Sequence, residues 1–117
     1  MQVVLSESQI RVLNGALLMV ERGARQVDNI PEKLWVVRNM VYSLNRRAPV
    51  DGVVTFNREE TIEVIAMLEA VLTVLSRSPS MLGVAVQNVL SAARPIKELR
   101  DTMHYGMKAQ QTNAPCA

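Results

Sequence analysis

The residues best suited to chemistry form a cationic row near the C-terminal end of the chain. They recur every three or four positions, with a tyrosine and one further arginine beside them. Residues spaced in this way lie on one side of a helix, where they could hold phosphate groups or an acidic partner. We refer to them as the cationic row: Arg94, Lys97, Arg100, His104, Tyr105 and Lys108.

The alternative is that this row is an ordinary solvated helix face. Glu98 and Asp101 lie among the cations and partly neutralise them. Lys97 and Asp101 are four positions apart, a spacing at which opposite charges pair on a helix surface. This alternative is the favoured interpretation of the row. Arg46 and Arg47, at the end of an earlier helical segment, are auxiliary candidates for phosphate binding.

Catalysis and metal binding find little support in the residue pattern. Asp101 precedes His104 by three positions and could orient its imidazole as a general base, but no signature of a nucleophile accompanies the pair. The sequence contains one histidine, so a histidine-rich metal site is excluded. The acidic cluster at Glu59, Glu60 and Glu63 lacks the Glu-x-x-His pattern of helical di-metal sites. We therefore expect no enzyme activity and no cofactor.

The positioning of these residues depends on helices, and the strongest helix signal spans Arg58–Arg77. Asn57 and Glu60 have the spacing of a capping box at its start. Apolar residues recur on two faces of this segment, so that it is apolar around most of its circumference, and such a helix is normally surrounded by neighbours. We predict that it is the central helix of a bundle.

Two helices are expected before the central one. Ser6 and Gln9 form a capping box for the first, which should end at Gly23 or just after it. Asn29 and Pro31 mark the start of the second. The segment 53–56 has strand-like composition but no evident partner strand, so we predict an extended connection packed on the bundle.

The end of the chain is expected to be helical and interrupted. Ser78 and Pro79 have the pattern of a cap and first residue of a fourth helix, which then continues to Ala93. Pro95 should either kink this helix or separate it from a fifth that runs to about Gln110. The polar tail, residues 111–117, is expected to be disordered.

Composition indicates a single domain, which we place at residues 1–110. The chain has 117 residues, of which 49% are hydrophobic and only 3% aromatic, so its core must be aliphatic. The net charge of +2 does not by itself indicate nucleic acid. The single cysteine, Cys116, permits no intrachain disulfide, and the N-terminal residues do not resemble a signal peptide. We expect a cytoplasmic protein without membrane association, located in the host cytoplasm if the chain is viral.

The fold class predicted is all-α, a compact bundle of four to five mainly antiparallel helices. The apolar surplus predicts self-association, with a dimer favoured, through the first helix or the 96–107 face. The preferred function is a non-catalytic protein–protein interaction module, either an adaptor or an inhibitor that occludes a partner surface. The alternative is binding of nucleic acid or a phosphorylated small ligand by the cationic row. The candidate interface residues are Trp35, Met103 and Met107.

Overall fold

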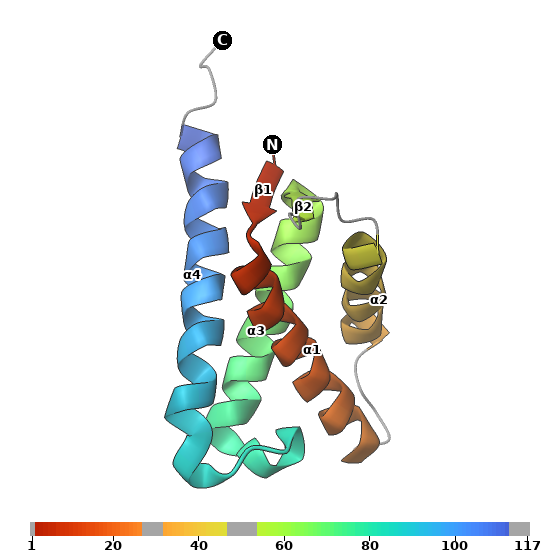
Figure 1. The fold of residues 1–117 in the computed structure, drawn as a ribbon, viewed down its shortest axis with the longest axis vertical. Coiled ribbons are helices and arrows are strands. Elements are labelled where there is room, and N and C mark those ends of the chain that lie inside the picture. Colours follow the sequence, from red (N-terminus) through yellow and green to blue (C-terminus); the bar gives the residue numbers. More distant parts are fainter. Residues whose placement is uncertain (1, 27–31, 47–53, 113–117) are drawn as a thin grey trace.

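The chain forms a four-helix bundle with a small two-stranded sheet at one end (Figure 1). A computed structural model describes residues 2–26, 32–46 and 54–112. Successive helices run in opposite directions along the long axis of the molecule (Figure 1). The all-α prediction is therefore confirmed. The elements are β1 (Gln2–Leu5), α1 (Glu7–Gln26), α2 (Glu32–Arg46), β2 (Val54–Asn57), α3 (Arg58–Arg77), the 3-10 turns η1 (Pro79–Leu82) and η2 (Val86–Asn88), and α4 (Val89–Thr112).

Helix α3 is the central element, as its hydrophobic pattern predicts. It contacts α1, α2, α4, η1 and both strands. The predicted capping box is present at its start, where Asn57 Oδ1 accepts from Glu60 N at 2.8 Å and Glu60 Oε1 accepts from Asn57 N at 2.9 Å. These bonds satisfy two backbone donors that the first turn of a helix leaves without partners. The start of α3 is thus fixed by the residues next to it in sequence.

Helix α1 also begins at its predicted capping box. Gln9 Oε1 accepts from Ser6 N at 2.8 Å, and Ser6 Oγ accepts from Gln9 N at 3.4 Å. The helix continues three residues past Gly23 and is described to Gln26, in keeping with an end just after Gly23. The predicted start of the second helix at residues 29–31 lies outside the described residues, and α2 is described from Glu32.

The strand-like segment before α3 has a partner that the sequence interpretation missed. β2 pairs antiparallel with β1, and Val3 lies opposite Phe56 while Leu5 lies opposite Val54. These four side chains are buried, whereas Val4 on the other face of the ribbon is exposed. The alternation of buried and exposed residues in both strands gives the ribbon one apolar face, which packs on the bundle.

The region between α3 and α4 also differs from the prediction. The residues after Ser78 form η1 and η2 instead of a fourth α-helix, because Gly83 adopts a left-handed conformation (φ 72°) that ends η1. Helix α4 starts only at Val89 and then continues through Pro95 to Thr112 without a break. There is accordingly no separate fifth helix in the described residues. Residues 113–117, most of the predicted tail, lie outside them.

The core is aliphatic, as the composition requires. Phe56 is its one phenylalanine, and the remaining buried side chains are almost all valine, leucine, isoleucine and methionine. Helix α4 contributes Ile96, Leu99 and Met103 from a single face. The cationic row lies beside this buried face, so its members range from exposed to half-buried.

Candidate functional site

The cationic row lies along α4, and the structure pairs two of its arginines with carboxylates. Arg94 Nε lies 3.4 Å from Glu98 Oε1, and Arg100 Nη2 lies 2.9 Å from Asp101 Oδ1. Asp101 therefore pairs with Arg100 and not with Lys97, contrary to the spacing argument. These pairs reduce the positive charge available to a phosphate group on this face.

The other members of the row vary in exposure. Lys97 and Lys108 are exposed, His104 is half-buried and Tyr105 is 75% exposed. No described carboxylate forms an ion pair with Lys97. The row is thus a mixed-charge helix face, in agreement with the solvated-face interpretation.

Of the two auxiliary candidates Arg46 and Arg47, the structure describes only the backbone of Arg46. Arg46 ends α2, which lies on the opposite side of the bundle from α4 (Figure 1). Arg47 lies outside the described residues.

The three candidate interface residues differ in accessibility. Met103 is fully buried, and Met107 is half-buried against the core. Most of the apolar face at residues 96–107, which we expected to mediate dimerisation, is therefore covered within the chain. Trp35 on α2 is half-buried, and the guanidinium carbon of Arg38 lies 5.1 Å from the centre of its ring.

A polar cluster that sequence reasoning missed joins α1 to α2. Arg38 Nε donates to Glu21 Oε1 at 2.6 Å, and the Tyr42 hydroxyl donates to the same oxygen at 3.1 Å. The Arg38 guanidinium also lies 4.8 Å from the centre of the Tyr42 ring. Burial of Tyr42 and its hydrogen bond to Glu21 raise the pKa of its phenol above the ordinary value. The cluster binds two helices together, and its polar groups are occupied by one another.

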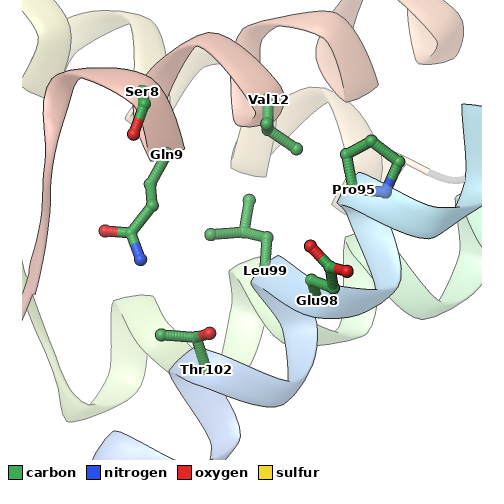
Figure 2. A pocket seen from close by; sticks show the side chains of 7 residues that line it. All are labelled: Ser8, Gln9, Val12, Pro95, Glu98, Leu99 and Thr102. Atoms are coloured by element: carbon green, nitrogen blue, oxygen red, sulfur yellow. The ribbon is translucent and has the colours of Figure 1, made fainter.

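A shallow pocket of about 240 Å³ opens between α1 and α4 (Figure 2). Leu99, Val12 and Pro95 supply its apolar surface. Ser8, Gln9, Glu98 and Thr102 supply the polar groups around it. Gln9 is already engaged in the cap of α1. The pocket is smaller than the roughly 300–1,000 Å³ typical of small-molecule sites and pairs no nucleophile with a base.

The two most exposed aliphatic residues of the described part of the chain lie at the junction of η2 and α4. Val86 is 78% exposed and Leu90 is 85% exposed. Both residues fall within the fourth helix that the sequence predicts after Ser78. Because the left-handed Gly83 interrupts the helical geometry after Leu82, Val86 and Leu90 do not share the buried face on which Leu82 lies. We call Val86 and Leu90 the apolar corner.

Neither a metal-binding cluster nor a membrane-spanning helix is found in the described part of the chain. No three histidine, cysteine or acidic side chains there gather in a way that could hold a metal ion. No helix among residues 2–26, 32–46 and 54–112 is long and apolar enough to cross a membrane. The Asp101 carboxylate, the expected orienting partner of His104, accepts hydrogen bonds from Arg100 at 2.9 and 3.1 Å.

Comparison with protein-family models, with curated proteins and with solved structures found no match to this chain. Its function is therefore argued from its own surface.

Proposed function

We propose that the chain is a non-catalytic protein–protein interaction module that docks on its partner through the apolar corner. The observation that carries this proposal is the exposure of Val86 and Leu90, at 78% and 85%, four positions apart. Single exposed aliphatic residues are common on protein surfaces, but adjacent ones form a patch that a partner can cover. Full burial of one such side chain is worth about 1.5–3 kcal/mol.

The other exposed aliphatic side chains are less suited to this role because they are dispersed. Val4, Leu18, Val36 and Ile62 lie on four different elements, and each is less exposed than either residue of the corner. Isolated residues of this kind need no special explanation. The corner is therefore the first surface to examine.

Self-association is the second part of the proposal. Because Met103 and its neighbours on α4 are buried within the chain, α1 is the better of the two expected dimer surfaces. Leu18 on α1 is 49% exposed, and no atom lies within 4 Å of the position a Cβ would take at Gly15. Light scattering at two protein concentrations distinguishes monomer from dimer directly.

Binding of nucleic acid or a phosphorylated ligand remains the alternative, and it is disfavoured by the ion pair of Arg100, whose side chain is only 25% exposed, with Asp101. Binding through phosphate contacts weakens steeply as salt rises, whereas binding through an apolar surface does not. Binding measured at low and at high salt therefore distinguishes the two functions.

The test is affinity purification of the tagged chain from cells that naturally produce it. We expect one protein to co-purify in near-stoichiometric amount with the wild type and to be lost with Val86→Ser/Leu90→Ser. The matched control is Val36→Ser, an exposed valine on another helix. Recovery of nucleic acid in place of protein, released by moderate salt and by Lys97→Glu, would contradict the proposal and support the alternative.

A further inference from the structure

The apolar corner lies within a part of the chain that contains no acidic residue. Between Glu69 and Glu98 the sequence has three cations, Arg77, Arg94 and Lys97, and no aspartate or glutamate. This stretch comprises the end of α3, both 3-10 turns and the start of α4. Its charge is therefore of one sign, in contrast to the mixed charges farther along α4.

One cation of this stretch lies next to the corner on its own helix. Arg94 follows Leu90 by four positions on α4, so that the two side chains share one face of the helix. The Arg94 side chain is 83% exposed. The side chain of Glu98, whose Oε1 lies 3.4 Å from Arg94 Nε, is 70% exposed. An exposed pair of this kind holds its partners weakly. Arg94 can therefore turn to a carboxylate that approaches the corner from outside.

A further cation reaches the same region from another helix. The space beside Gly83 is occupied by the side chain of Arg22, and a Cβ placed at Gly83 would lie 3.0 Å from Arg22 Cδ. Arg22 is exposed near the end of α1. Because Gly83 precedes Val86 by three positions, Arg22 flanks the segment that carries the corner. Positive charge from α1 thus lies beside Gly83, in the segment that leads into the corner.

We propose that the apolar corner recognises an acidic amphipathic segment of a partner protein, in which leucine-like side chains alternate with aspartate or glutamate. This inference rests on the proposed function and adds the chemistry of the partner. Val86 and Leu90 would pack against the apolar side chains, while Arg22 and Arg94 would face the carboxylates. Complementary charge of this kind gives specificity and accelerates association.

Other ligands with negative charge fit the corner less well. A phosphate backbone offers no apolar surface to cover Val86 and Leu90. A membrane surface would be held by two aliphatic side chains without the aromatic residues and the long apolar face that typify interfacial helices. The protein segment is the ligand that uses both properties of the corner.

The experiment is an NMR titration of the isotopically labelled full chain with a synthetic peptide of roughly 14 leucine and glutamate residues in helical repeat. Two control peptides replace glutamate by lysine or leucine by serine. We expect saturable backbone shifts centred on residues 83–94 with the first peptide alone. We further expect affinity to fall at least about tenfold for Leu90→Ser, the change that loss of one buried leucine produces, and to fall for Arg22→Glu/Arg94→Glu. Val36→Ser should bind as the wild type does.

Several results would overturn the inference. The inference is wrong if the lysine peptide binds as tightly as the glutamate peptide. It is also wrong if the shifts centre on the pocket at Val12 and Leu99, or if no saturable shift is observed. Tighter binding to phosphatidylserine vesicles or to a short single-stranded oligonucleotide than to the peptide would also overturn it. If the peptide fails while the natural partner is still captured and is lost with Val86→Ser/Leu90→Ser, the proposed function stands and the acidic chemistry is wrong.

Discussion

Arg38 on α2 and Glu21 on α1 form the closest charged contact between these two helices, with 2.6 Å between Arg38 Nε and Glu21 Oε1. The pair is partly shielded from solvent, with side-chain exposures of 28% and 21%. Tyr42 adds a second donor to the same carboxylate oxygen. A cluster that satisfies its own polar groups in this way holds α2 in place without exposing a reactive group.

The Tyr42 phenol should make stability fall at alkaline pH. Its pKa is raised in the folded chain, so its contribution is complete below the unfolded value of about 10 and is lost as pH rises through the folded pKa. We expect the free energy of unfolding of the wild type to decline more steeply above pH 10 than that of Tyr42→Phe. Urea denaturation between pH 8 and 11 measures both. Parallel curves for the two proteins would show that Tyr42 does not titrate as expected.

The same substitution should destabilise the chain strongly at Leu68 and hardly at all at Leu90. Leu68 is fully buried in α3, and Leu68→Ala should cost about 2–5 kcal/mol of unfolding free energy. Leu90 is almost fully exposed, and Leu90→Ala should change it by no more than about 0.5 kcal/mol. Urea denaturation at neutral pH compares the two. A cost above about 1 kcal/mol at Leu90 would indicate that this side chain supports the fold and is not reserved for a partner.

Substitution by alanine should change the stability of the chain in opposite directions at Gly15 and at Gly83. Gly15 lies inside α1 with open space beside it, so Gly15→Ala should stabilise the chain by up to about 1 kcal/mol. Gly83 has φ 72° and closely contacts Arg22, so Gly83→Ala should destabilise it by about 1–2 kcal/mol. Thermal unfolding monitored by circular dichroism detects both shifts. A lower melting temperature for Gly15→Ala would mean that α1 packs closely on another surface at that position.

The elements predicted best from sequence are those determined by neighbouring residues. The cap at Asn57 and Glu60 and the cap at Ser6 and Gln9 are visible because each involves residues three positions apart. The pairing of β1 with β2 was missed because its partners lie about fifty residues apart, and the composition of a strand does not identify its partner.

The fourth helix was predicted to start at Pro79, ten residues too early, and the cause is the conformation of Gly83. Gly83 directly follows an apolar segment, a position where a left-handed glycine often ends a helix. Recognition of that stop would have placed the start of the last helix after Gly83, as the structure does. Pro95 lies inside the helix that follows, where it removes one backbone hydrogen bond, yet α4 continues through it and is not divided in two.

The cationic row was predicted correctly as one helix face, but its pairing was not. Periodicity placed Asp101 beside Lys97, whereas the structure pairs it with Arg100, whose side chain is only 25% exposed. A long side chain held partly against the protein loses less freedom on pairing than a fully solvated lysine. Sequence spacing does not report this difference.

The central claim, that the apolar corner docks on a partner protein, is tested most directly by photo-crosslinking in cells that naturally produce the chain. A benzoylphenylalanine is placed at position 90 in one variant and at position 36, also exposed, in another. We expect a discrete adduct with a second protein from position 90 and none from position 36, and the adduct should disappear with Val86→Ser. Absence of an adduct from position 90 in the folded variant, or equal adducts from both positions, would contradict the claim.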